Sequence, residues 1–235
     1  MLTPYTSIRG GCQGLPVTKS GYHHGDLCAA LIDAGLQLTR TGGPDALTIR
    51  AATRRAGVSP NAAYRHFADR EALLTAVAMA IHDKVAARML KPVHRRGSAQ
   101  TRARDQLRAV GLGYVEFALN EPGWFAVAFF GGSASLDAGE AKLGPPHEHG
   151  GSDFSAVGDD WAPPPFRALV DALDAMTEAG VLQPDRRRGA EWPCWSAVHG
   201  FAELALHGPL RDTSRDELDS LARRTVDDIV AGLVR

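Results

Sequence analysis

The sequence predicts an all-α protein with a small N-terminal helix-turn-helix head and a larger helical body. Apolar residues recur every three or four positions along much of the 235 residues, which is the spacing of amphipathic helices. Residues 47–70 read as two short helices joined by a tight turn, followed by the start of a third. Of the 26 Lys and Arg and the 27 Asp and Glu, residues 1–96 hold 13 and 6, which leaves 13 and 21 for the remainder. The basic excess lies in the part of the chain that holds the predicted helix-turn-helix, as expected if this motif contacts the phosphates of DNA. Random variation of surface charge is the alternative.

Residues 1–20 are expected to form a flexible arm, because they mix Gly, Pro, Ser and Thr without periodicity. Arg9 and Lys19 could reach a minor groove from this arm, although an untethered tail is the simpler interpretation. Asp26 then caps a first helix that ends near Gly42 and Gly43. This helix would support the helix-turn-helix through apolar residues at helical spacing: Leu27, Leu31, Ala34 and Leu38.

Capping residues as well as spacing predict the helix-turn-helix. Thr48 caps its first helix and Gly57 ends that helix. Ser59 caps the second helix, and Pro60 takes the first helical position, where its missing N–H costs nothing. We expect the second helix to run to about residue 67, with Ala63 and Phe67 on its buried side. Its outward side would carry Asn61, Ala62, Arg65 and His66, with Tyr64 at the margin. On spacing alone, an ordinary helical hairpin is the alternative.

A fourth helix is predicted from Asp69, its N-cap, to about Leu90, and Pro92 stops it. Arg70 lies in the first turn, where the helix dipole disfavours a cation. A DNA phosphate near Arg70 would relieve this mismatch, and Glu71 is the local alternative. The buried side of this helix would carry Leu73, Val77, Ile81 and Val85.

Five segments resemble, in order, the N-terminal domain of TetR-type transcription regulators. They are YHHGDL (22–27), GPDALT (43–48), AGVS (56–59), YRHF (64–67) and DREALL (69–74). The resemblance covers residues 21–77 and implies that the YRHF segment belongs to the recognition helix. It also implies that the basic residue at the start of the fourth helix, here Arg70, lies against the DNA backbone. We therefore expect a DNA-binding domain at 21–90 that includes the connecting fourth helix.

Residues 91–235 are expected to form a helical domain for ligand binding and dimerisation. Its first helix, about 101–120, contains Gly111 and Gly113, which each cost roughly 1 kcal/mol relative to alanine and so indicate a close helix crossing or room for a ligand. Pro122 opens a short helix, GWFAVAFF, which must be buried because it is apolar nearly all round. Residues 131–162 are glycine-rich, acidic and without a period, so we interpret them as a flexible loop. Pro163 to Pro165 lead into a further predicted helix, which Gly180 closes.

The last two predicted helices should form an antiparallel pair. One begins near Pro193, and the other begins with a capping box formed by Ser214 and Glu217. The segment WSAVHGFAEL (195–204) resembles the WHG-type C-terminal domain of some TetR-like regulators, and FALNEPGWFAVAFF (117–130) resembles its earlier helices. That resemblance implies dimerisation through the last two helices. The expected interface residues are Val198, Ala202, Leu206, Leu218, Leu221, Thr225 and Ile229.

The same resemblance implies that a small molecule binds the helical body and that the fourth helix transmits the change to the head. Large apolar residues are tentative walls of the pocket: Phe117, Trp124, Phe125, Phe129, Phe166, Met176 and Trp195. Each of them could equally be an ordinary core residue. A small apolar or amphipathic effector is expected, and the sequence does not identify it.

No catalytic site, metal site or cofactor is predicted. Cys194, His199 and Glu203 would share one helix at i, i+5 and i+9, which does not stack them on one face. The His-x-His at 147–149 lies in the acidic loop and is weak evidence for a metal. The three cysteines are widely spaced and fit neither a disulfide framework nor a metal pair, and no apolar run approaches the roughly 18 residues of a membrane span. We therefore expect a cytoplasmic protein.

Together these observations predict a one-component transcriptional regulator, expected to be a repressor that binds a palindromic operator as a homodimer. Base contacts are assigned to Arg50, Asn61, Ala62 and Arg65, because Arg can pair with guanine, Asn can pair with adenine and an alanine methyl can touch thymine. Phosphate contacts are assigned to Thr48, Ser59, Tyr64, His66 and Arg70. The alternative is a helical interaction module that has the same fold and no specific DNA readout.

Overall fold

All regular structure in the computed structural model is helical within residues 24–92, 97–130 and 162–234, which are the residues it describes. The predicted all-α class is confirmed. The predicted arm at 1–20 lies outside these residues, as does nearly all of the predicted loop at 131–162. Among the described helices, none combines the length and the hydropathy needed to cross a membrane.

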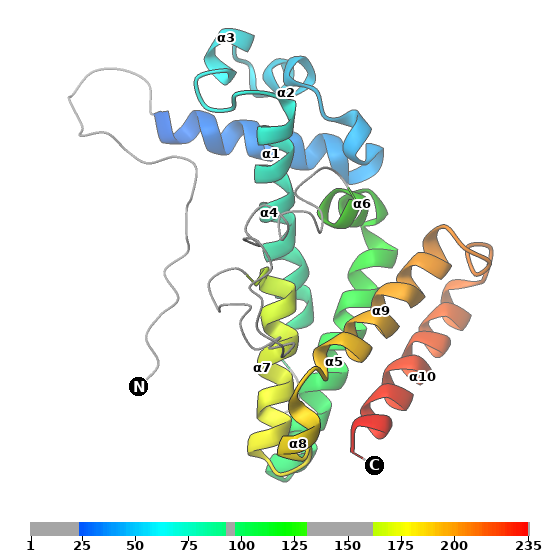
Figure 1. Ribbon diagram of the computed structural model, residues 1–235. Coiled ribbons are helices and arrows are strands. Elements are labelled where there is room, and N and C mark those ends of the chain that lie inside the picture. The colour runs from blue at the N-terminus through cyan, green and yellow to red at the C-terminus, as the bar shows by residue number, and fades with distance from the viewer. Residues whose placement is uncertain (1–23, 93–96, 131–161, 235) are drawn as a thin grey trace, which may run out of the picture.

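The head consists of α1 (His24–Gly42), the one-turn helix η1 (Pro44–Ala46), α2 (Ile49–Ala56) and α3 (Pro60–Ala63). Figure 1 shows these elements at the top of the molecule, with α4 (Arg70–Met89) running down from them into the body. α1 begins at His24, so the prediction that Asp26 caps this helix is wrong. The helix already includes His24, two positions before Asp26, so Asp26 lies within the first turn.

The predicted caps of the helix-turn-helix are confirmed. The hydroxyl oxygen of Thr48 accepts a hydrogen bond from the N–H of Ala51 at 3.0 Å. Ser59 accepts one from the N–H of Ala62 at 3.3 Å. Gly57 ends α2 in the left-handed conformation at φ 71°, which glycine adopts without steric strain. Local sequence therefore sets both ends of the turn.

The second helix of the pair, α3, is shorter than predicted. The N–H groups of Arg65 and His66 bond to the carbonyls of Ala62 and Ala63, three residues back, at 3.3 and 2.9 Å. This tighter spacing replaces the α-helical ladder after residue 63, and the chain continues as turns until Phe67 is buried. The predicted buried side is nevertheless correct, because Ala63 and Phe67 both lie in the core.

A single core joins the head helices to α4. Thr39 and Thr53 are the buried polar residues of this region, and each hydroxyl bonds back to a carbonyl of its own helix, at 2.8 and 2.9 Å. The other core side chains are apolar and the following are completely buried: Leu31, Leu47, Ala52, Ala63, Leu73 and Val77. Because the first turns of α4 belong to this core, a rotation of α4 carries the head with it.

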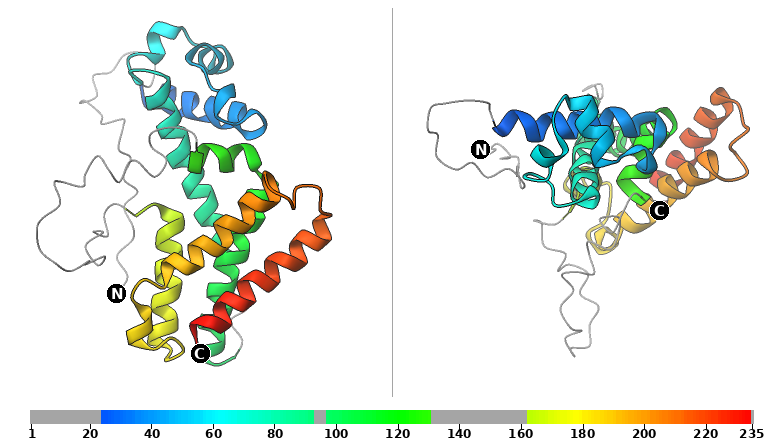
Figure 2. Two further views of the ribbon diagram at one scale, coloured as in Figure 1. Left: turned by 45° about the vertical axis from the view of Figure 1, so that its right-hand side comes forward. Right: turned by 90° about the horizontal axis from the view of Figure 1, so that it is seen from above.

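The body contains α5 (Ala99–Asn120), α6 (Pro122–Phe130), α7 (Pro164–Glu178), α8 (Pro184–Arg187), α9 (Glu191–Leu206) and α10 (Arg215–Leu233). α5 runs back along α4 toward the head, α6 lies across the top of the body beneath α1, and α9 and α10 form an antiparallel pair on one flank (Figure 2). The short helix α8 was not predicted. Ser98 and Ser214 accept hydrogen bonds from backbone N–H groups and cap α5 and α10.

Gly113 allows α5 to cross α4 closely. A Cβ atom at this position would lie 2.7 Å from Cα of Met89 and 2.8 Å from the carbonyl oxygen of Arg88. At Gly111 a Cβ would meet the side chain of Val226 at 3.1 Å. The sequence allowed either a close helix crossing or room for a ligand at these glycines. The close crossing holds for Gly113, whereas Gly111 borders a cavity that is described below.

Candidate DNA interface and effector cavity

The head exposes most of the side chains that the sequence assigned to DNA. Among the residues assigned to bases, Arg50, Asn61 and Arg65 are exposed and Ala62 is half-buried. Among those assigned to phosphates, Thr48, Ser59 and Tyr64 are exposed, whereas His66 and Arg70 are half-buried. Both caps keep a hydroxyl proton free to donate, because each hydroxyl oxygen uses only a lone pair in capping.

Arg54 is a candidate that the sequence analysis missed. It lies four residues after Arg50 on α2, so the two side chains project from the same side of the helix. Both are exposed, and within the described residues neither guanidinium takes part in an ion pair or hydrogen bond. By contrast, Arg55 donates to Oε1 of Gln37 on α1 at 2.6 Å. The i, i+4 spacing from Arg50 was the signal that could have found Arg54.

The guanidinium of Arg70 is turned inward. Nε donates to the carbonyl of Leu47 at 2.7 Å, and one terminal nitrogen donates to the carbonyl of Pro44 at 2.6 Å. The remaining nitrogen lies 3.8 Å from a carboxylate oxygen of Glu71. Backbone carbonyls of the α1–α2 connection therefore already stabilise this cation, whereas a phosphate contact of Arg70 stays a prediction.

A network of polar and close contacts joins α6 to α1, and we call it the α1–α6 junction. Two nitrogens of Arg40 donate to the two carboxylate oxygens of Glu121, both at 2.7 Å. Nε1 of Trp124 donates to the carbonyl of Leu36 at 2.8 Å. A Cβ atom at Gly123 would lie within 3.0 Å of the carbonyl oxygens at the end of α1, so only glycine permits this approach. The head is thus attached to the body through α6 as well as through α4.

α6 also contacts α4 through His82. A ring nitrogen of His82 lies 3.1 Å from the carbonyl oxygen of Ala128, and its ring is 5.5 Å from that of Phe129. Burial lowers the pKa of His82, and the hydrogen bond to this carbonyl opposes that effect more weakly. On the neighbouring turn, the ammonium of Lys84 lies 5.5 Å from the ring centre of Trp124. α6 is therefore held between α1, which belongs to the head, and α4, which leads into it.

Six rings meet where α6, α5 and α9 approach one another, and we call them the His199 ring cluster: Tyr114, Phe125, Phe129, Phe130, Trp195 and His199. The hydroxyl of Tyr114 lies 2.8 Å from Nδ1 of His199. Burial raises the pKa of Tyr114 well above its usual value, with a smaller contribution from Glu203. Burial also lowers the pKa of His199, against the opposing effect of Glu203. Both groups are therefore neutral near pH 7.

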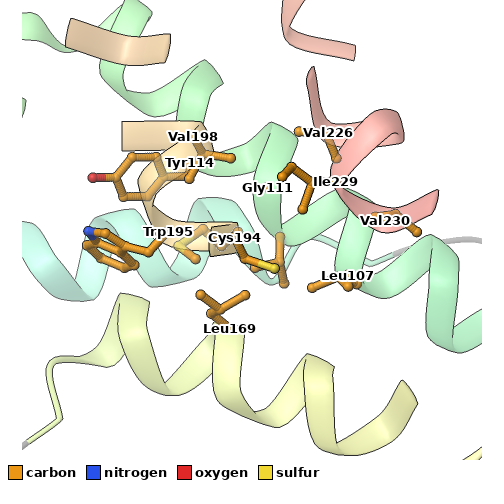
Figure 3. Close-up of a pocket in the computed structure, with 12 residues that line it drawn as sticks. Leu107, Gly111, Tyr114, Leu169, Cys194, Trp195, Val198, Val226, Ile229 and Val230 are labelled. Atoms are coloured by element: carbon orange, nitrogen blue, oxygen red, sulfur yellow. The ribbon is translucent and has the colours of Figure 1, made fainter. Parts of the chain in front are cut away.

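An apolar cavity of about 30 Å³ lies between α4, α5, α7, α9 and α10. Figure 3 shows Tyr114 and Trp195 on one side of it and Val226, Ile229 and Val230 of α10 on the other. The polar atoms of Tyr114 and Trp195 point away from α10. The remaining walls are Met89, Leu107, Val110, Gly111, Leu169, Cys194 and Val198. This volume holds only one or two water molecules, so a ligand requires the walls to move apart.

The cavity has different walls from those that the sequence suggested. Of the seven predicted pocket residues, Trp195 lines this cavity. Phe125 and Met176 are completely buried, and the ring of Phe117 is buried against Trp124. Phe129 belongs to the His199 ring cluster, and Phe166 packs against Trp192 and Trp195. These aromatic side chains pack mainly against one another, whereas aliphatic side chains of α5, α9 and α10 form the cavity.

The predicted interface residues divide into two groups. Val198, Ala202 and Leu218 are buried within this single chain, so a partner chain has little of them left to contact. The others are partly buried: Leu206, Leu221, Thr225 and Ile229. Sequence reasoning missed two neighbours on α9: Leu204 is 47% exposed, and a Cβ at Gly200 would meet nothing within 4 Å. The open surface of α9 therefore lies along these two residues.

Neither of the two cysteines in the described residues offers a reactive thiol. Cys194 is a free, buried thiol whose pKa burial raises to about 11, so it is a poor nucleophile. Cys28 is disulfide-bonded, which corrects the expectation that no cysteine is bridged. Within the described residues, no three His, Cys, Asp or Glu side chains are grouped so that they could hold a metal.

A capped helix-turn-helix with exposed arginines on a helical body defines a DNA-binding transcription regulator. Comparison with known families places it more narrowly. Residues 31–77 match the model for bacterial regulatory proteins of the tetR family, and residues 107–229 match the tetracyclin repressor-like C-terminal domain. The chain belongs to the TetR family of transcriptional regulators, which are not enzymes. A search of curated proteins gave no match.

Solved structures share the fold over most of their length. A protein of unknown function from Rhodococcus sp. RHA1 is 24% identical, with a TM-score of 0.63 over 92% of this chain and 100% of that one. FadR from Bacillus subtilis, in complex with stearoyl-CoA, is 14% identical, with a TM-score of 0.59 over 87% and 98%. A TetR variant from Acinetobacter baumannii AYE, in complex with minocycline, is 22% identical, with a TM-score of 0.55 over 87% and 94%.

Proposed function

We propose that this TetR-family regulator is a homodimeric repressor that binds a palindromic operator and leaves it when a small molecule occupies the body. The single observation that carries the proposal is the head itself, whose exposed arginines surround a correctly capped helix-turn-helix. Two heads related by a two-fold axis would enter successive major grooves about 34 to 36 Å apart. A palindromic operator is the consequence of that symmetry.

Base contacts are proposed for Arg65, Asn61 and Ala62 on and after α3, and for Arg50 on α2. Phosphate contacts are proposed for the hydroxyls of Thr48, Ser59 and Tyr64, for His66, and now for Arg54. Arg70 is proposed to support DNA binding mainly indirectly. Its guanidinium donates to backbone carbonyls and so fixes the α1–α2 connection of the head. Most of these side chains are exposed, which supports their availability to DNA.

Selection of bound sequences from a random duplex pool, followed by titration at several salt concentrations, tests the proposal. Arg65→Ala should cost about 1–3 kcal/mol and relax one operator position, whereas Arg54→Ala should weaken all sequences and lower the salt slope by about one. Arg104→Ala is the matched control, because Arg104 is exposed on α5 in the body. Recovery of no motif and no salt-dependent binding would favour a helical interaction module instead.

The proposed dimer uses the exposed surface of α9 together with α10. Leu204 and Gly200 leave apolar surface uncovered there, and α10 contributes partly buried Leu221 and Ile229. A Leu204→Lys variant should shift the mass in light scattering from dimer to monomer, whereas Leu90→Lys, which changes an equally exposed leucine after α4, should not. A monomeric wild-type protein at micromolar concentration would contradict the dimer.

The effector is proposed to act through two connections between the cavity and the head. Met89, at the end of α4, forms part of the cavity wall. Tyr114 joins that wall to the His199 ring cluster, whose phenylalanines lie on α6, and α6 is attached to α1 at the α1–α6 junction. A ligand changes the spacing of the heads only if it binds one spacing more tightly than the other.

A further inference from the structure

The His199 ring cluster lies beside the cavity and combines aromatic faces with an unpaired carboxylate oxygen. We propose that this cluster is the polar end of the effector site and that it takes an aromatic amine in its protonated form. The inference rests on the proposed regulatory function and names the chemical class of the effector. Three features of the described residues carry it: the rings, Glu203 and the cavity.

The rings of the cluster surround the imidazole of His199. The ring of His199 has its centre 5.6 Å from that of Phe129 and 5.7 Å from those of Phe125 and Phe130. Trp195 stacks on it at 6.4 Å with 18° between the planes. Aromatic faces carry a negative potential that attracts cations, most strongly where water is excluded. The imidazole at the centre is neutral near pH 7, so it leaves this potential uncompensated.

Glu203 acts electrostatically on the same cluster, because it raises the pKa of Tyr114 and opposes the lowering of the pKa of His199. It follows His199 by one helical turn on α9, as His199 follows Trp195, so the three side chains lie on one side of that helix. One carboxylate oxygen lies 3.2 Å from Nδ1 of His207. The other is buried, and no hydrogen-bond partner reaches it from the described part of the chain. A buried acceptor without a donor is costly, and an ammonium N–H would satisfy it.

The cavity provides for the apolar part of the ligand. It shares Tyr114 and Trp195 with the His199 ring cluster, and its other walls are almost entirely aliphatic. Because about 30 Å³ is too small for an aromatic ring, binding must displace side chains of α10 such as Ile229, which is only partly buried. The cluster itself is open to solvent at Phe130, which is 49% exposed. An amine can therefore enter at the cluster and open the cavity behind it.

Three probes share the phenethyl group and differ in the charge of the polar end: phenethylamine, phenethyl alcohol and hydrocinnamate. The alcohol matches the amine in size, and each probe is titrated calorimetrically against the full-length protein at pH 7. We expect the amine to bind with a Kd of about 1 mM or below, and at least about tenfold more tightly than the alcohol or the carboxylate. Glu203→Gln should reduce the preference for the amine to near parity without changing the affinity for the alcohol.

Two controls keep the result specific. His207→Gln breaks the pair with Glu203 but keeps the carboxylate, so the preference for the amine should persist. Glu178→Gln removes an exposed carboxylate at the end of α7 and should change nothing. Equal binding of amine and alcohol, a preference that survives Glu203→Gln, or no binding of any probe would each overturn the proposal. Operator binding is measured on the same preparation, so a failure of the ligand class is distinguishable from a failure of the regulatory function.

Discussion

Replacing Gly123 by alanine should weaken the attachment of the head to the body. The added Cβ would lie within 3.0 Å of the carbonyl oxygens of Thr39 and Arg40, which are backbone atoms that cannot rotate away. Forcing such a methyl into a packed contact costs about 1–3 kcal/mol. Separation of the helices would also lengthen the bond from Trp124 to Leu36, which adds about 0.5–1.5 kcal/mol.

The greater helix propensity of alanine returns at most about 1 kcal/mol, so we expect Gly123→Ala to lower the free energy of unfolding by about 1–3 kcal/mol. Urea unfolding followed by far-UV circular dichroism, at one fixed protomer concentration, measures this difference. Gly232→Ala is the control, because a Cβ there meets nothing within 4 Å and should leave stability equal or slightly higher. Equal unfolding midpoints for Gly123→Ala and wild type would refute the close contact on which this reasoning depends.

Three further variants test particular contacts. Arg70→Ala should lower the free energy of unfolding in urea by about 1–3 kcal/mol, because two backbone carbonyls lose a charged donor. Unchanged stability with weaker DNA binding would instead indicate that Arg70 acts mainly by contacting a DNA phosphate. Ser59→Ala should cost about 0.5–2 kcal/mol in the same assay through loss of the α3 cap, and an unchanged midpoint would contradict that role. The folded protein holds His82 with a lowered pKa, so stability should be fully present above about pH 6.5 and decline as the pH falls toward the folded pKa. His82→Gln should flatten this decline, measured by unfolding at a series of pH values.

The parts of the head that depend on neighbouring residues were predictable from the sequence. Thr48, Gly57, Ser59 and Pro60 act within one turn of their own positions, and the structure has each in its expected place. The direction of Arg70 was not predictable in this way. Its acceptors lie 23 and 26 residues earlier in the chain, and only the packing of η1 against α4 brings them within reach.

The cavity was harder to predict for a related reason. Bulky aromatic residues were expected to line it because they are large and apolar, but large rings fill space best against other rings. Gly111 and small aliphatic residues such as Val198 and Val226 leave the gap instead, on the side of the cavity where α5, α9 and α10 meet. The sequence gives the size of each side chain directly. The distance between two helix axes depends on every contact along them, so the position of a gap cannot be predicted from side-chain size alone.

The two connections between cavity and head differ in what they can transmit. Met89 lies at the far end of α4, where a displaced wall can tilt the whole helix and with it the core of the head. The α1–α6 junction lies much nearer the recognition helix, and its paired hydrogen bonds between Arg40 and Glu121 fix orientation as well as distance. A ligand that moved α4 alone would strain this junction, because α1 would rotate against a fixed α6. In the proposed regulation, release of the operator would therefore require α4 and α6 to move together. The His199 ring cluster, which contacts α6 and shares Tyr114 with the cavity wall, is placed to couple them.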